Sequence, residues 1–285
     1  MAVSSYVGWG HVRAGPLQKG HALDGIADYQ FVRALNAANY GDLYLARTPA
    51  RLPVEAEHVV VKVVPGTADD ATFRRATREL KHFALVRSDK LVTIYDAGRQ
   101  SGTFFYTMEY LDLGTLEDPA RPLSREEILV AVADAAEAVH ALHESGVAHR
   151  DVKPANVLLH EGGAKLSDLG LSQLLTPGMV FTGTGQLGLE YTDPAILVGG
   201  EASRATDIWS LGATLHKALT GESVYGPLPS NEPLLLVRAI LAAEVSPDTS
   251  LEPAVADIVA ACTAKDVAQR PGTAADVAGA LRALV

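Results

Sequence analysis

"HRDVKPANVLL", residues 149–159, is the most informative stretch of this sequence of 285 residues. It places Asp151, Lys153 and Asn156 on one short loop. Phosphoryl transfer to a hydroxyl needs these three types of side chain: a carboxylate that accepts the hydroxyl proton, a cation for the transferred phosphate, and an oxygen ligand for a metal ion. The loop therefore predicts a centre for phosphoryl transfer.

A second acidic motif follows this loop. "KLSDLGLS", residues 165–172, supplies Asp168 close to the turn residue Gly170. Because Mg²⁺ prefers oxygen ligands, Asn156 and Asp168 are candidates to hold the ion against phosphate oxygens. The competing interpretation is a pair of ordinary surface turns, and the length of the first motif and its order with the second argue against it.

The composition is that of a globular protein. Hydrophobic residues make up 48% of the chain and charged residues 20%, which excludes a disordered protein. The net charge of −10 argues against a general nucleic-acid-binding protein, whose surface should be basic. The single cysteine, Cys262, cannot form an internal disulfide, and its apolar neighbours indicate a core position.

The sequence predicts a cytoplasmic domain. No run of about 18 apolar residues occurs, so we expect no transmembrane helix. The first residues, "MAVSSYVGWGHVRAG", lack the apolar core of a signal peptide. The low cysteine content fits a reducing compartment. A helix end at Val285 leaves open whether the domain is the cytosolic part of a longer protein.

The hydrophobic pattern is strand-like in the first part of the chain. Residues 1–25 show no period and are interpreted as an N-terminal extension. Five runs rich in β-branched and aromatic residues then predict strands at 29–35, 42–47, 59–64, 91–98 and 103–111. One amphipathic helix is expected over residues 69–86.

The pattern becomes helical after residue 114. The segment 124–146 begins with a capping box, Ser124 and Glu127, and ends at Gly146. Its predicted apolar stripe is Ile128, Val132, Ala135, Val139 and Leu142. Further helices are expected at about 206–220, 233–244, 253–264 and 273–284.

With these motifs in this order, the chain resembles the eukaryotic-type Ser/Thr protein kinases, which occur in bacteria as well as in eukaryotes. The resemblance covers nearly all of residues 28–285. It implies an α+β, bilobal kinase domain over residues 26–285, with a small antiparallel-sheet N-lobe (about 26–110) and a larger helical C-lobe (about 111–285). It also implies ATP and Mg²⁺ as cofactors and proteins as substrates, and leaves open whether two copies associate or phosphorylate one another.

The resemblance assigns roles to the two motifs. Asp151 resembles the catalytic base, and Lys153 matches the Ser/Thr-specific arrangement. Asn156 and Asp168 match the Mg²⁺ ligands, with Leu169 in place of the usual phenylalanine.

The nucleotide-binding residues are implied in the same way. Lys62, in "VVVK", matches the lysine that contacts the α- and β-phosphates, and Glu79 matches its ion-pair partner. Gly41 and Leu43 match the glycine-rich loop and the start of the next strand. Val60 stands where the family usually has alanine.

The adenine site follows from "YTMEYL", which resembles the hinge between the lobes. Met108 matches the gatekeeper, the backbones of Glu109 and Leu111 would bond the base, and Leu158 would form the floor of the pocket. An apolar slot with a few backbone polar groups is what a purine requires.

Two further positions have family counterparts in the helical part. Asp207 resembles the aspartate that accepts hydrogen bonds from the catalytic-loop backbone, and Arg270 resembles the arginine near the end of the domain. His140 and His143 lie three apart on a predicted helix, but a zinc site is disfavoured because no third ligand is evident.

The chain departs from the family in its glycine-rich loop, "LNAANYGDLYLAR" (35–47). Asn36 and Ala38 stand for the first two glycines, and Gly41 is the third. Glycines let backbone N–H groups approach phosphates without an intervening Cβ. We therefore expect a loop that still covers ATP, with reduced affinity.

Two more departures follow Asp168. Ala195 replaces the glutamate that pairs with Arg270, so Arg270 needs Asp193, Glu201 or solvent instead. Gly188 replaces a threonine that in the family touches the catalytic aspartate and lysine, which puts substrate handling in question.

The segment "VFTGTGQ" suggests regulation. Thr182 and Thr184 are candidate phosphorylation sites, with Thr176 as a further candidate, and Arg150 is a ready partner for a phosphate. The competing interpretation is an unmodified Thr/Gly loop.

Three functions are therefore weighed. The first is an active Ser/Thr protein kinase, which is favoured because the acting residues are retained. The second is a pseudokinase that binds nucleotide or acts as a scaffold, suggested by the four supporting positions that differ: Asn36, Ala38, Gly188 and Ala195. A small-molecule phosphotransferase fits less well, because such enzymes usually lack a segment of this length after the Asp-Leu-Gly motif.

Overall fold

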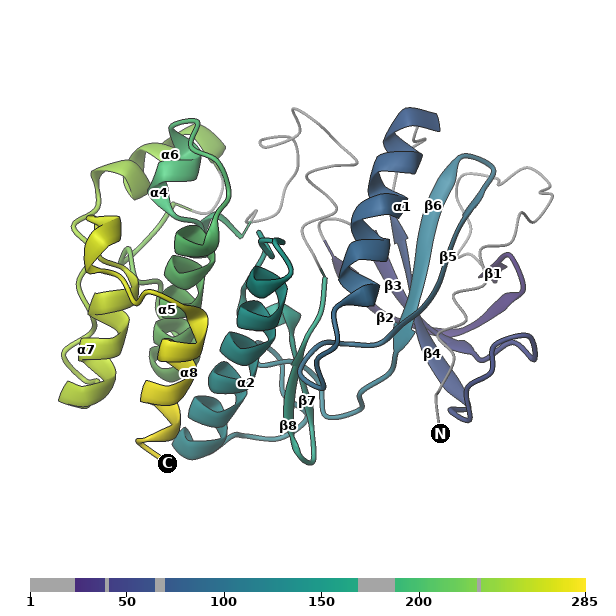
Figure 1. The fold of residues 1–285 in the computed structure, drawn as a ribbon, viewed down its shortest axis with the longest axis horizontal. Coiled ribbons are helices and arrows are strands. Elements are labelled where there is room, and N and C mark those ends of the chain that lie inside the picture. The colour runs from purple at the N-terminus through teal and green to yellow at the C-terminus, as the bar shows by residue number, and fades with distance from the viewer. Residues whose placement is uncertain (1–23, 39–40, 65–69, 169–187, 230–231) are drawn as a thin grey trace. The chain divides into compact units, whose positions relative to one another are not determined.

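The computed structural model describes residues 24–38, 41–64, 70–168, 188–229 and 232–285 (Figure 1). These residues fall into two compact units. The sheet unit contains the described residues up to 84 together with 92–110. The helical unit contains residues 85–91 and the described residues from 111 onwards.

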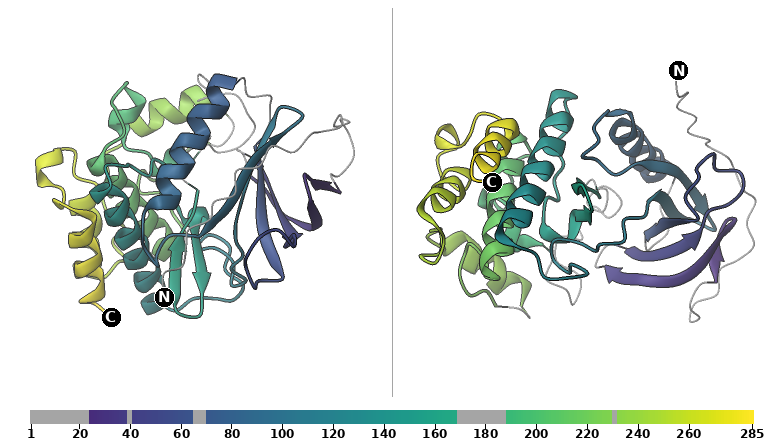
Figure 2. Two further views of the ribbon diagram at one scale, coloured as in Figure 1. Left: turned by 45° about the vertical axis from the view of Figure 1, so that its right-hand side comes forward. Right: turned by 90° about the horizontal axis from the view of Figure 1, so that it is seen from below.

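The sheet unit is built on six antiparallel strands. In chain order these are β1 (Gly25–Ile26), β2 (Tyr29–Ala38), β3 (Gly41–Arg47), β4 (His58–Val64), β5 (Ile94–Gln100) and β6 (Thr103–Glu109). Their order across the sheet is β1-β2-β3-β4-β6-β5 (Figures 1 and 2). β4 and β6 are rich in β-branched and aromatic residues, as the sequence pattern predicts for strands.

The two faces of this sheet differ in composition. Since side chains alternate along a strand and register partners share a face, every second residue of β4 belongs to one face. One face carries the core cluster Ile26, Tyr29, Ala46, Val59, Val61, Val63 and Phe105. The other face carries Val60 and Lys62, whose register partners are Met108 and Leu43 respectively, among others.

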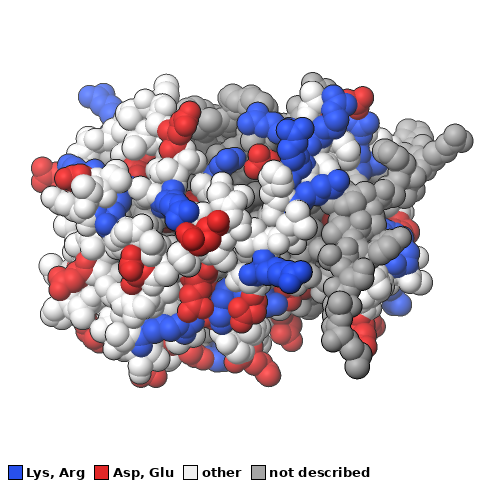
Figure 3. All heavy atoms as spheres, viewed as in Figure 1, with Lys and Arg blue, Asp and Glu red and all other residues white. Residues whose placement is uncertain are grey.

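Helix α1 (Asp70–Leu85) packs on the second face. Its ring of Phe73 meets that of Phe104 edge-on at 5.7 Å between centroids, and Phe104 lies on the same face as Met108. Ala76, Leu80 and Phe83 are buried at helical spacing. Its outer surface is basic, because Arg74, Arg75, Arg78 and Lys81 are exposed, and Lys and Arg side chains gather over this helix in Figure 3.

The helical unit is organised around α2 (Arg125–Glu144) and α5 (Arg204–Thr220). The remaining helices are α4 (Pro194–Leu197), α6 (Pro233–Ala242), α7 (Pro253–Cys262) and α8 (Ala274–Arg282). α2 packs against α5, α8 and β8, and α5 packs against α7 (Figure 2). At one close approach a Cβ on Gly212 would come within 2.5 Å of the Cβ of Cys262, so the crossing of α5 and α7 requires glycine.

The sequence expectations for α2 hold only in part. The Ser124–Glu127 capping box is present, and the positive φ of Gly146 follows the end of the helix. Four residues of the predicted apolar stripe, Val132, Ala135, Val139 and Leu142, are buried, whereas Ile128 is only half-buried. Burial also extends beyond the stripe, to Leu129, Ala131 and Ala133. α2 is surrounded by other elements, and short alanine side chains allow that close packing.

A short hairpin of β7 (Val157–His160) and β8 (Gly163–Leu166) is present that the sequence pattern does not predict. Four residues are too few for a period to be recognised. Cys262 is buried as expected, and burial raises the pKa of its thiol to about 12. Among the helices of the described residues, none is both long and apolar enough to cross a membrane.

Candidate active site

The three residues of the first motif form one polar cluster. Lys153 Nζ lies 2.9 Å and 2.8 Å from the two carboxylate oxygens of Asp151. Asn156 Nδ2 donates to the Asp151 carbonyl oxygen at 2.7 Å and to Asp151 Oδ2 at 3.0 Å. The Asp151 side chain keeps 22% of its surface exposed. It is thus oriented by two neighbours and remains accessible to an incoming hydroxyl.

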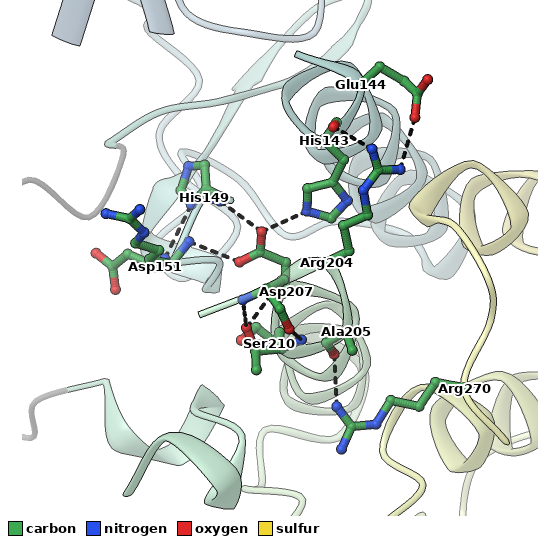
Figure 4. A network of polar contacts seen from close by, with 12 residues as sticks. His143, Glu144, His149, Asp151, Arg204, Ala205, Asp207, Ser210 and Arg270 are labelled. Atoms are coloured by element: carbon green, nitrogen blue, oxygen red, sulfur yellow. Dashed lines mark hydrogen bonds and ion pairs between the residues drawn. The ribbon is translucent and has the colours of Figure 1, made fainter. Parts of the chain in front are cut away.

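Asp207, on α5, forms hydrogen bonds that hold the loop containing Asp151 (Figure 4). Its carboxylate accepts hydrogen bonds from the backbone N–H of His149 at 2.7 Å and of Arg150 at 2.9 Å. Arg150 has a φ of 72°, a conformation that costs a non-glycine residue energy and that these bonds help to fix. The expected bracing role of Asp207 is confirmed.

His149 links the loop to the second motif. Its Nε2 is 2.9 Å from the Ser167 carbonyl oxygen, and its Nδ1 is 3.3 Å from the Asp151 backbone N–H. A neutral ring with hydrogen on Nε2 satisfies both contacts. Complete burial lowers the pKa of His149, although the nearby carboxylates of Asp207, Asp151 and Asp168 oppose this.

His143 is a residue of the site that the sequence interpretation did not assign. Its Nε2 lies 2.8 Å from Asp207 Oδ2, and both side chains are buried (Figure 4). The histidine therefore holds the carboxylate that supports the loop. Its spacing from His140 had drawn attention to metal binding, and only the fold could bring it to Asp207.

Asp168 and Asn156 are adjacent through Ser167. The Ser167 backbone N–H donates to the Asn156 carbonyl oxygen at 2.9 Å, and its hydroxyl donates to the same oxygen at 3.1 Å. Asp168 is buried and has a φ of 57°. Because Asn156 Nδ2 is bonded to Asp151, its Oδ1 is the side-chain atom that can bind a cation. One carboxylate and one amide oxygen fit Mg²⁺, which takes its other ligands from phosphate and water.

Gly188 lies beside the catalytic cluster. A Cβ at this position would be 3.7 Å from Lys153 Nζ and 3.8 Å from Asp151 Oδ1. This is the place where the family threonine would contact both groups. Gly188 has a φ of 66°, which a β-branched residue adopts only with strain. The backbone at this position suits glycine, and Asp151 and Lys153 form an ion pair with each other.

Asp193 takes the place of the absent family glutamate as the ion-pair partner of Arg270. Arg270 forms a buried ion pair with Asp193, with Arg270 Nη1 2.5 Å from Asp193 Oδ2. Arg270 also donates to the carbonyl oxygens of Ala205 and Ala264 and lies over the Trp209 ring at 4.9 Å. Of the three options open from sequence, Asp193 is the one realised.

The same carboxylate caps a helix. Asp193 Oδ1 accepts from the Ala195 backbone N–H at 2.9 Å, at the start of α4. Ala195, which aligns with the family glutamate, is exposed. The carboxylate that pairs with Arg270 therefore lies two residues before the position of the family glutamate.

In the sheet unit, Leu43, Lys62 and Met108 share the face that is free of the core cluster. Lys62 and Met108 are buried. The Glu109 backbone N–H donates to the Thr93 carbonyl oxygen at 3.0 Å. These positions suit an adenine site of the expected kind.

Several predicted residues are less well defined by the structure. Glu79 is half-buried on α1 and makes no ion pair within the described part of the chain, so its pairing with Lys62 stays a prediction. Leu111 and Leu158 are half-buried in the helical unit. Asn36 and Ala38 lie in β2 opposite Leu43 and Gly41. The predictions for Thr176, Thr182, Thr184 and Leu169 fall outside the described residues.

Comparison with known proteins agrees with this arrangement. The family model for the protein kinase domain matches residues 33–279. The chain belongs to the protein kinase family. It is 33% identical over 208 residues to the Ser/Thr-protein kinase PknJ of Mycobacterium tuberculosis, covering 70% of this chain and 35% of the relative. It is 29% identical over 260 residues to PrkC of Bacillus subtilis, covering 87% and 39% respectively.

Solved structures show the same fold. The crystal structure of the Mycobacterium tuberculosis PknI kinase domain matches with a TM-score of 0.65 and 23% identity, over 93% of this chain and 100% of that one. The chain therefore has the bilobal α+β kinase fold that the sequence predicts. It spans little more than a third of the length of the curated relatives PknJ and PrkC.

Proposed function

We propose that this domain, residues 26–285, transfers the γ-phosphate of ATP to Ser and Thr hydroxyls of proteins. The observation that carries the proposal is the cluster in which Asp151 is held by Lys153 and Asn156 while part of its carboxylate remains exposed. The names of the relatives as Ser/Thr-protein kinases support the acceptor class.

The transfer step follows from the charges around Asp151. An acceptor hydroxyl donates a hydrogen bond to the carboxylate, its oxygen forms a bond to the γ-phosphorus, and its proton passes to Asp151. The bond from the γ-phosphorus to the bridging oxygen breaks, and the electron pair leaves with ADP. Lys153, 2.8 Å from the carboxylate, is placed to offset negative charge that develops on the transferred group.

Nucleotide binding is assigned to the non-core face of the sheet and its neighbours. Lys62 supplies the cation for the α- and β-phosphates, and Glu79 is its proposed partner. The family resemblance assigns Gly41 and Leu43 to the phosphate loop, and Met108, Glu109, Leu111 and Leu158 to recognition of the base. When bound, Mg²⁺ would neutralise phosphate charge, held by Asp168 and by Asn156 Oδ1.

The pseudokinase alternative gains no support from the catalytic loop. Its case rests on residues that differ in supporting positions, and one of these, Ala195, is compensated by Asp193. The described helical unit retains Asp151, Lys153 and Asn156 in contact with one another.

Location and regulation are also proposals. We place the domain in the cytoplasm, on the basis of its cysteine usage and composition. Residues 1–25 are interpreted as an N-terminal extension.

Thr182 and Thr184 remain the proposed phosphorylation sites. Mass spectrometry of active protein should detect phosphate on Thr182 or Thr184. Active protein that carries no phosphate in this segment, together with a fully active Thr182→Ala/Thr184→Ala variant, would contradict the proposal.

A transfer assay tests the function itself. The protein is incubated with labelled ATP, Mg²⁺ and a generic protein acceptor, and the modified residues are identified by mass spectrometry. We expect phosphate on Ser and Thr, abolished by EDTA and by Lys62→Met. Mg²⁺-independent labelling, or labelling that survives Lys62→Met unchanged, would contradict the assignment.

A further inference from the structure

Helix α1 carries a charged surface that plays no part in the transfer step. Four exposed residues lie in one row along this helix, at spacings of four, three and four positions: Arg74, Arg78, Lys81 and Leu85. The row lies opposite the buried residues Ala76, Leu80 and Phe83, and Arg75 lies beside it. We call the row and Arg75 together the α1 basic face, and Lys and Arg side chains gather over this helix in Figure 3.

The arginines of the α1 basic face are not neutralised by acidic neighbours. Three of its side chains form no ion pair or hydrogen bond with any residue that the structure describes: Arg74, Arg75 and Arg78. Of the two acids on α1, Asp70 is paired with Arg99 at 2.7 Å, and Glu79 is half-buried and lies nearer the buried side. The charge of the arginines is therefore directed to solvent, where it favours an anionic partner.

Leu85 adds an apolar group to the same row. It is the last residue of α1 and keeps 69% of its surface exposed. Cations in line with an exposed leucine are typical of surfaces that bind lipid headgroups, because the cations contact phosphates while the apolar side chain reaches the acyl chains. A soluble acidic partner would leave this leucine in water.

The shape of the α1 basic face also favours a flat partner. From Arg74 to Leu85 the row extends about 16 Å at the helical rise of about 1.5 Å per residue, and the outer surface of a helix is convex. A convex row of this length can contact a flat array of anionic groups, but it cannot enclose a peptide. Binding to such an array depends on the number of cations, at roughly fivefold in affinity for each Lys or Arg.

From the unneutralised arginines, the exposed leucine and the convex shape together, we propose that the α1 basic face binds anionic lipid headgroups at a membrane surface. Arg74, Arg75 and Arg78 then contact lipid phosphates, and Leu85 enters the boundary between headgroups and acyl chains. The net charge of −10 repels the protein from such a surface, so the local concentration of cations on α1 decides which side meets the membrane. This binding needs no nucleotide and goes beyond the proposed phosphoryl transfer.

Co-sedimentation with lipid vesicles tests this surface in the absence of ATP. We expect the protein to bind vesicles of phosphatidylcholine that contain about 30% phosphatidylglycerol, and to be released by about 0.5 M salt, because salt screens these contacts. Removing three cations, by Arg74→Gln/Arg75→Gln/Arg78→Gln, should lower the partition coefficient by about a hundredfold, at roughly fivefold per cation. The matched control changes the net charge equally at exposed positions elsewhere and should bind as the wild type does: Arg47→Gln/Arg238→Gln/Lys265→Gln.

Two further variants distinguish a lipid surface from other anionic partners. Arg74→Lys/Arg75→Lys/Arg78→Lys keeps the charge and should retain vesicle binding, whereas a specific phosphate or carboxylate site that uses the planar guanidinium group would lose it. Leu85→Ser should weaken vesicle binding by about tenfold, because the apolar contact with the acyl chains is lost. Equal binding by the wild type and the three-glutamine variant, loss of binding in the three-lysine variant, or an unchanged Leu85→Ser variant would overturn the proposal. Release from vesicles by soluble polyglutamate at equal charge concentration would also overturn it and assign the face to an acidic protein segment.

Discussion

The buried ion pair between Asp193 and Arg270 offers a quantitative test of how the chain compensates for a lost family residue. Removing Asp193 by substitution with alanine leaves the Arg270 guanidinium buried without its counter-charge. Breaking a buried pair from one side costs about 3–5 kcal/mol of unfolding free energy. The lost N-cap on α4 adds about 1 kcal/mol.

Other contacts of Arg270 reduce this cost. Its bonds to the Ala205 and Ala264 carbonyl oxygens and its contact with the Trp209 ring persist in the variant. We therefore expect Asp193→Ala to lose about 4 kcal/mol, the lower end of the summed range of about 4–6 kcal/mol. Arg270→Met leaves Asp193 buried with the cap bond, and should cost about 3 kcal/mol. The double variant should be about 2 kcal/mol more stable than the sum of the two, because the unpaired charge is removed with its partner.

Urea unfolding of the four proteins measures this cycle, and Asp193→Asn keeps a folded variant available if Asp193→Ala is too unstable. A further variant separates this account from a simple family alignment. Adding Ala195→Glu to Asp193→Ala should restore no stability, because position 195 is exposed. Recovery of stability by Ala195→Glu, or strict additivity of the cycle, would refute the reasoning.

Three further predictions concern the active site. Gly188→Thr, which restores the family residue, should lower the unfolding free energy by about 1–2 kcal/mol because of the left-handed backbone, without raising kcat. Gly188→Ala is the control, because its Cβ fits the space but has the same backbone strain. A gain in kcat for Gly188→Thr would contradict the prediction. Because burial lowers the pKa of His149 in the folded state, the unfolded chain binds the proton more readily. The unfolding free energy should therefore be constant above the ordinary histidine pKa of about 6.5 and fall as the pH decreases below it. His149→Gln should flatten this part of the profile of unfolding free energy against pH. Asn36→Gly/Ala38→Gly should lower the KM for ATP by about five- to thirtyfold, corresponding to about 1–2 kcal/mol, because backbone N–H groups then approach the phosphates without a Cβ; an unchanged KM would mean that these substitutions are neutral.

Much of the fold is predictable from local signals in the sequence. The central strands β4 and β6 of the sheet unit are rich in β-branched and aromatic residues, and α2 is marked by its Ser124–Glu127 capping box. These signals act within a few residues, so they survive without tertiary information. The Asp151, Lys153 and Asn156 cluster is local in the same sense, since all three lie on one loop.

The remaining features depend on contacts between distant segments. His143 reaches Asp207 across 64 positions, and Asp193 reaches Arg270 across 77. No local pattern selects these partners, and for Arg270 the sequence left three options. The burial of α2 on most of its surface was missed for the same reason, because the number of neighbouring elements is not encoded in its own periodicity.

Phosphoryl transfer by Asp151→Asn measures the central claim most directly. The substitution preserves the shape of the side chain and removes the carboxylate that accepts the hydroxyl proton. Labelled ATP, Mg²⁺ and a protein acceptor are supplied to wild type, to Asp151→Asn and to Asp257→Asn, a matched change at an exposed position. We predict that Asp151→Asn lowers kcat by about 10²–10⁴-fold with its fold intact by circular dichroism, whereas Asp257→Asn behaves as wild type. Equal phosphate incorporation by wild type and Asp151→Asn would contradict the account.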